Sequence, residues 1–130
     1  MKLGYIIIYV SDVPKTVAFY ETAFDLKRRF IHESHLYAEM ETGSTALAFA
    51  GNEAAEMAGL GLLPNDPRTV AAGWEICLIT GDVAKAYDQA ISKGCSPVAP
   101  PTEKLLGHFI HTRMDKHIQF YQIGFHFFCF

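Results

Sequence analysis

The chain has 130 residues, 50% of them hydrophobic and 19% charged, which suits one folded domain and leaves little room for a second. Its formal net charge of −3 argues against nucleic acid as a partner, since binding to that polymer depends on a basic surface. The charge also gives no attraction to an anionic membrane. Three widely spaced cysteines and a short apolar N-terminal run predict a soluble, cytoplasmic protein with free thiols.

The first half begins with a predicted strand and helix. Residues 5–10, YIIIYV, are apolar and β-branched, as in a buried strand. Asp12 can cap the following helix by accepting backbone N–H groups, and Pro14 is tolerated in a first helical turn. The apolar stripe of that helix consists of Val13, Val17, Tyr20 and Phe24. Three short strands are predicted after it, at residues 26–34, 35–42 and 45–50.

The same pattern returns about 70 residues later. A strand at 74–79 is followed by a second Asp cap, Asp82. The second helix stripe consists of Val83, Tyr87, Ala90 and Gly94. The sequence therefore predicts a single domain, 1–130, made of module one (1–50), a linker (51–72) with one helical turn at 53–57, and module two (73–130). Each module would be a β-α-β-β-β unit that buries its apolar face with help from the other. The alternative is that two capped helices follow strands by coincidence.

Two segments carry a family resemblance. YVSDVPKTVAFYETAF (9–24) and TGDVAKAYDQAISKG (80–94) resemble the strand–Asp–helix segments of the vicinal oxygen chelate superfamily, the group of glyoxalase I, bleomycin-resistance proteins and extradiol dioxygenases. The resemblance covers residues 3–104 well and the rest poorly. It implies an α+β fold in which two βαβββ modules form curled mixed sheets around a shared cleft, and it implies a homodimer.

The resemblance also assigns metal-ligand positions, on the first and last strand of each module. These fall on Tyr5, Ala48 and Glu75, with Asp115 as the remnant of a final turn. Only Glu75 is a competent ligand, whereas a divalent ion normally needs three or more. We therefore expect no metal and no cofactor at the usual place. The alternative is a divalent metal held by other ligands.

Side-chain alternation predicts which strand residues face the cleft. On the first strand, the side chains predicted to face the helix are Ile6, Ile8 and Val10. The predicted ligand-binding residues are Tyr5, Ile7, Tyr9, Tyr37, Glu39, Glu75, Cys77 and His108. Glu75 is also the candidate catalytic group, because desolvation would raise its pKa; its alternative role is to pair with Arg or Lys. For Tyr37, Glu39 and Glu41 the alternative is a solvated edge strand, and the basic run 27–29 is expected to be a solvated face.

Two functions agree with these residues. The first is a metal-independent protein that binds or sequesters a small organic molecule between aromatic walls, with acidic groups that suit a cationic ligand. The second is a metal-dependent lyase of the lactoylglutathione lyase type, or a dioxygenase, with Glu75 as the base. A third possibility is a member without any ligand. The aromatic-rich residues 105–130 are compatible with a buried strand, a dimer contact or an altered terminus.

Overall fold

The computed structural model describes the backbone of residues 1–66, 69, 75–104, 107–113 and 118–121, with side chains up to Pro101 apart from residues 98 and 99. The chain divides into two compact units, Met1–Asn65 and Asp66–Phe130, and each is described by itself. Among the described helices, none has the length and apolar character needed to cross a membrane.

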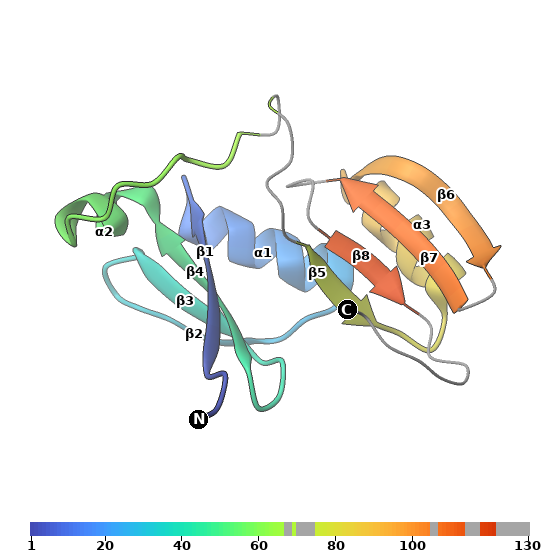
Figure 1. The fold of residues 1–130 in the computed structure, drawn as a ribbon, viewed down its shortest axis with the longest axis horizontal. Coiled ribbons are helices and arrows are strands. Elements are labelled where there is room, and N and C mark those ends of the chain that lie inside the picture. Colours follow the sequence, from blue (N-terminus) through green and yellow to red (C-terminus); the bar gives the residue numbers. More distant parts are fainter. Residues whose placement is uncertain (67–68, 70–74, 105–106, 114–117, 122–130) are drawn as a thin grey trace. The chain divides into compact units, whose positions relative to one another are not determined.

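The first unit has one helix-covered sheet of four strands. Its elements are β1 (Tyr5–Val10), α1 (Val13–Phe24), β2 (Arg28–Ile31), β3 (Tyr37–Met40), β4 (Ala46–Gly51) and α2 (Asn52–Met57). The strand order is β1-β4-β3-β2, with β1 parallel to β4 and the other neighbours antiparallel (Figure 1). The predicted β-α-β-β-β order of this half is therefore confirmed.

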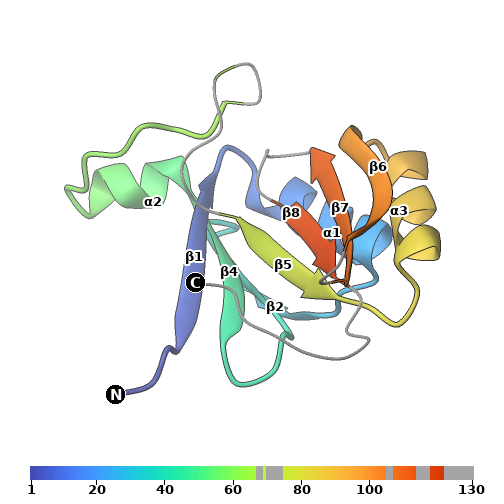
Figure 2. The same ribbon diagram turned by 45° about the vertical axis from the view of Figure 1, so that its right-hand side comes forward.

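The second unit repeats this plan. Its elements are β5 (Ile76–Ile79), α3 (Val83–Ser92), β6 (Ser96–Lys104), β7 (Gly107–Arg113) and β8 (Ile118–Tyr121). The order β5-β8-β7-β6, with β5 parallel to β8, is that of the first sheet (Figure 2). Each element begins 68 to 72 residues after its counterpart. A repeated α+β unit with mixed sheets is thus present.

Both main helices begin as predicted. The Asp12 carboxylate accepts the Lys15 backbone N–H at 2.9 Å, and Asp82 accepts that of Lys85 at 3.0 Å. α1 ends at Phe24, and its C-cap residue Asp25 has a left-handed backbone with φ of 58°, which turns the chain toward β2. An N-cap hydrogen bond to an aspartate therefore marks the start of each of these two helices.

Aromatic packing fills the core between α1 and the first sheet. The Tyr20 and Phe49 rings lie 4.7 Å apart, and both side chains are buried. One correction concerns the stripe of α1: Ala23 is its buried fourth member, while Phe24 at the helix end is half-buried. A second concerns α3, which ends at Ser92, so Gly94 lies beyond it in a left-handed conformation with φ of 101°.

The predicted linker, 51–72, begins with regular structure. Gly51 is the last residue of β4, and α2 contains the predicted helical turn. The Gly51 N–H donates to the Leu36 carbonyl at 2.9 Å, and a Cβ on Gly51 would lie 3.2 Å from Leu36 Cδ2. Beyond α2, the Asn65 amide donates to the Tyr9 carbonyl at 3.0 Å. These hydrogen bonds connect the β2–β3 turn to the end of β4, and the segment after α2 to the end of β1.

Candidate functional site

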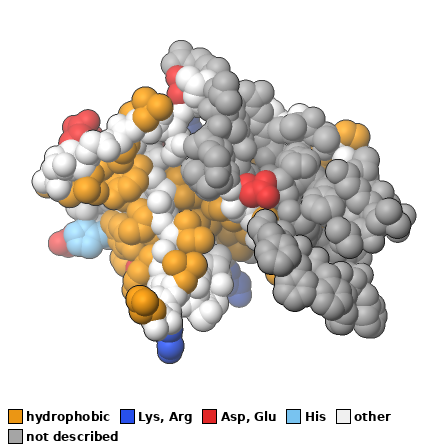
Figure 3. Space-filling model, viewed as in Figure 1, with side chains coloured by type: hydrophobic (Ala, Val, Ile, Leu, Met, Phe, Trp, Pro, Cys, Tyr) orange, Lys and Arg blue, Asp and Glu red, His pale blue; other side chains and the backbone are white. Residues whose placement is uncertain are grey.

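The first sheet has a helix face and an open face. Ile8 on the helix face is 4% exposed, whereas Tyr5 and Ile7 on the open face are 55% and 45% exposed. Ile6, predicted to face the helix, is nevertheless 43% exposed, because β1 is the outermost strand of this sheet. Hydrophobic side chains gather over β1 in the space-filling view (Figure 3). The burial of β1 follows the predicted alternation only around Ile8, and the strand presents an exposed apolar surface that includes Tyr5, Ile6 and Ile7.

The open face carries two rows of large side chains beside a row of alanines. Strand register places three pairs side by side: Tyr5 with Ala46, Ile7 with Ala48, and Tyr9 with Ala50. On the other side of β4, Glu39 is opposite Ala48 and Tyr37 is opposite Ala50. The three alanines are buried. We call this surface the open face: Tyr5, Ile7, Tyr9, Ala46, Ala48, Ala50, Tyr37 and Glu39.

A polar network occupies the β3 side of the open face. The Tyr37 hydroxyl donates to Glu39 Oε1 at 3.1 Å, and Arg29 Nη1 donates to Glu39 Oε2 at 3.0 Å. Arg29 also holds both oxygens of Glu41, at 3.0 and 2.9 Å. Glu39 is only 7% exposed. The solvated edge-strand alternative is wrong for Glu39, because β3 lies between β4 and β2.

A bulge in β2 brings Arg29 into this network. Arg28 is opposite Met40 and Phe30 is opposite Glu39, so the register shifts between them. Arg28 pairs with Glu21 of α1 at 3.3 Å, while the Phe30 ring lies 6.0 Å from that of Tyr37. Arg29 is exposed, as expected for the basic run, but it also pairs with Glu39 and Glu41. The missed signal was a pair of acids on one hairpin strand facing an arginine on the other.

Three groups of the network keep one protonation state near neutral pH. Burial, followed by the hydrogen bond to Glu39, raises the pKa of Tyr37 to about 12. The hydrogen bond from Arg29 lowers the pKa of Glu41, and the same bond raises the pKa of Arg29. The network therefore supplies a neutral phenol, a guanidinium and a carboxylate as fixed hydrogen-bonding groups.

The remaining predicted site residues belong to the second unit. Glu75 precedes β5 and is exposed, as is Cys77 within it, while Ile76 and Leu78 are half-buried. Register aligns Cys77 with Gln119, and Gln119 with His111, whereas His108 is opposite Glu103. The His108 side chain and Asp115 lie outside the described part. A contribution of these residues to one ligand site stays a prediction.

The residues at the assigned ligand positions of the first unit do not fit a divalent ion. Tyr5 offers a phenol and Ala48 a methyl group. The carboxylate opposite Ala48 on β3 belongs to Glu39, and both of its oxygens already accept hydrogen bonds. Over the described residues, no group of three or more His, Cys, Asp or Glu side chains could hold a metal. We therefore derive no chemical step through a metal.

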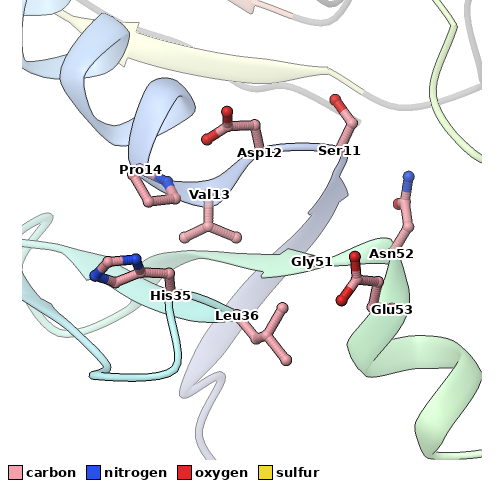
Figure 4. Close-up of a pocket in the computed structure, with 9 residues that line it drawn as sticks. All are labelled: Ser11, Asp12, Val13, Pro14, His35, Leu36, Gly51, Asn52 and Glu53. Carbon is pink, nitrogen blue, oxygen red and sulfur yellow. The ribbon is translucent and has the colours of Figure 1, made fainter.

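A pocket of about 580 Å³, which sequence reasoning missed, lies at the carboxyl ends of β1 and β4 (Figure 4). It is built by three segments distant in sequence: the β1–α1 turn, the β2–β3 turn and the start of α2. Its lining residues are Ser11, Asp12, Val13, Pro14, His35, Leu36, Gly51, Asn52 and Glu53. We call it the strand-end pocket. The sequence did not predict this pocket, because its walls come from turns that only the fold brings together.

Comparison with known families agrees with this architecture. The model of the Glyoxalase/Bleomycin resistance protein/Dioxygenase superfamily matches residues 2–117. The chain belongs to this superfamily. The match continues past residue 104, where the sequence resemblance had weakened, and it includes β7. A search of curated proteins finds no significant match.

Several solved structures share the fold at low sequence identity. A glyoxalase/bleomycin resistance protein/dioxygenase from Nocardioides is 15% identical with a TM-score of 0.74, over 94% of this chain and 83% of its own. A glyoxalase-related enzyme from Fulvimarina pelagi is 14% identical with a TM-score of 0.77, over 95% and 88%. TioX from Micromonospora sp. ML1 is 14% identical with a TM-score of 0.68, over 94% and 98%. Likeness at this level shows the common fold.

Proposed function

We propose that this superfamily member binds a small organic molecule on the open face of the first sheet, without a metal. The observation that carries the proposal is the network of Tyr37, Glu39 and Arg29, in which a buried carboxylate is fixed among aromatic side chains. Aromatic walls with a few oriented polar groups are the usual composition of small-molecule sites.

The protonation states of the network favour binding over proton transfer. A general acid or base works best when its pKa is near the working pH. The pKa of Tyr37 is about 12, and the Arg29 and Glu41 pKa values are displaced further from neutrality. These groups therefore present constant hydrogen-bonding partners to a ligand.

The charge and aromatic character of the site favour an organic cation. Glu39 and Glu41 carry two negative charges against the single positive charge of Arg29. Tyr5 and Phe30 are 55% and 41% exposed, and their aromatic rings suit cation–π contacts. A planar or quaternary cation therefore satisfies both features of this surface.

The first test is the metal content of the purified protein. We expect far less than one Ni, Zn, Fe or Mn ion per chain, and no rise in melting temperature with added divalent ions. An ion near one per chain, with a melting temperature that rises with the logarithm of its concentration, would contradict the proposal and favour the metal-dependent lyase or dioxygenase. Glu75 would then be the first residue to replace.

The second test is a thermal-shift screen of aromatic cations against neutral molecules of the same shape. Stabilisation by the cations should be lost in Glu39→Gln and reduced in Tyr37→Phe. Glu33→Gln is the matched control, because Glu33 is an exposed acid in the β2–β3 turn, away from the open face. Equal stabilisation of the wild type and Glu39→Gln would place the ligand elsewhere.

A further inference from the structure

We propose that the strand-end pocket is a second binding site, which takes a small primary ammonium compound with a short apolar stem. The lining residues that the structure describes all belong to the first unit, and they are separate from the open face. The inference rests on three features of this pocket: the sign of its charge, an unsatisfied oxygen in its wall and its apolar floor.

The charge of the strand-end pocket selects a cation. Among the lining residues that the structure describes, Asp12 and Glu53 carry carboxylates and His35 an imidazole, and none is Lys or Arg. An anion at the start of α1 is disfavoured, because the Asp12 carboxylate already accepts the Lys15 N–H and Pro14 has no N–H to offer. Two carboxylates at the rim therefore leave a positively charged group as the ligand with matching charge.

An unsatisfied acceptor supplies the second argument. The Oδ1 atom of Asn52 is buried and has no hydrogen-bond partner among the residues that the structure describes. Asn52 extends from the start of α2 toward the Ser11–Asp12 turn (Figure 4). A buried acceptor without a donor is unfavourable, so its presence in a pocket wall points to a donor that arrives from outside. An ammonium group carries three N–H donors and no acceptor.

The floor of the pocket suits a short hydrocarbon stem. Val13 is 2% exposed, and Leu36 and Pro14 are partly buried beside it. Gly51 permits this arrangement, since a Cβ at this position would make a tight contact of 3.2 Å with Leu36 Cδ2. A volume of about 580 Å³ is within the usual range for small-molecule pockets.

The test is a titration of the full chain with butylammonium, followed by amide NMR shifts. We expect saturable shifts at residues 11–13 and 51–53, and none with butyrate, which has a similar stem and the opposite charge. Glu53→Gln and Asn52→Leu should each weaken binding about tenfold, because each removes a hydrogen-bonding partner of a charged group. Glu56→Gln, an exposed acid on the same helix but outside the pocket, should bind as the wild type does.

Asn52→Leu also separates lost binding from lost folding. Because it replaces a buried, unsatisfied amide oxygen with part of an apolar side chain of similar size, the melting temperature of this variant should not fall. Equal binding by the wild type and both variants, equal binding of butyrate, or no saturable shift at tens of millimolar would each overturn the proposal. Tyr37→Phe should keep butylammonium binding, so failure at the open face is distinguishable from failure here.

Discussion

At the residue scale, Glu39 shows how a carboxylate can be kept in the interior of a sheet. Its side chain is 9% exposed, and each of its two oxygens accepts a hydrogen bond from a different neighbour. A buried charge without such partners would be strongly disfavoured. Removal of either partner should therefore affect both the stability of the fold and the chemistry of the open face.

The first prediction concerns the phenol of Tyr37. Its pKa rises from 10.0 to about 12 in the folded chain. Below pH 10 both folded and unfolded chains keep this proton, and between pH 10 and 12 only the folded chain keeps it, so stability should fall as the pH rises through this window. Tyr37→Phe should flatten this alkaline loss of stability. Phenolate absorbance should show a tyrosine that titrates near pH 12 in the wild type and is missing in the variant.

The second prediction compares two adjacent arginines. Arg29→Met leaves the buried Glu39 without its guanidinium partner and should lower the melting temperature by several degrees. Arg28→Met breaks only the exposed pair with Glu21 and should leave it nearly unchanged. Circular dichroism melts at pH 7 measure both. Equal effects of the two substitutions would show that Glu39 does not depend on Arg29.

The sequence predicted correctly those side-chain positions that depend on the alternation within a single strand. Alternation alone placed Tyr37 and Glu39 on one face, and the structure joins them by a hydrogen bond. The burial of Glu39 could not be foreseen, because it depends on β3 lying between two other strands. Arg29 was missed as a partner of these acids because the basic run 27–29 was expected to be only a solvated face, and the sequence does not show the bulge at this position.

At the element scale, the helix starts were the most predictable features. Asp12 and Asp82 cap their helices with nearly the same geometry, because each accepts the N–H three residues ahead. The strand order was predictable only through the family resemblance, since no local pattern states which strands are neighbours. The strand-end pocket was not predictable, because its walls come from three turns far apart in sequence.

The third prediction is that the two N-caps, Asp12 and Asp82, contribute equally to the stability of the fold. Asp12→Ala and Asp82→Ala should each lower the free energy of unfolding by about 1 kcal/mol, as loss of an N-cap usually does. Lys15→Ala is the matched control, because it lies in the first turn of α1 and keeps the capped N–H. Urea unfolding measures all three. A cap substitution with no more effect than the control would show that the helix start is fixed by packing alone.

At the scale of the whole molecule, one topology is used twice with different side chains. Register makes Cys77, Gln119 and His111 the counterparts of Ile7, Ala48 and Glu39. The repeated backbone therefore does not imply a repeated site. This is also why family membership, although shown here, leaves the ligand to be found from the residues themselves.

The fourth prediction concerns self-association. Within the described residues β1 pairs only with β4, and it carries exposed apolar side chains, including Tyr5, Ile6 and Ile7. We expect a homodimer, and we expect Ile6→Lys to weaken it, because a charge on an outer strand opposes pairing with another chain. Leu63→Lys, at a fully exposed position after α2, is the control. Sedimentation velocity measures this, and a monomeric wild type would contradict the expectation.

The bulge in β2 has a further consequence for how this surface could diversify. Because Arg29 is the extra residue of the bulge, deletion of its single codon should leave Arg28 and Phe30 opposite their present partners on β3. The hairpin would become regular, while Glu39 and Glu41 would lose their shared cation. One in-frame deletion could thus change the electrostatic preference of the whole face without altering any other side chain.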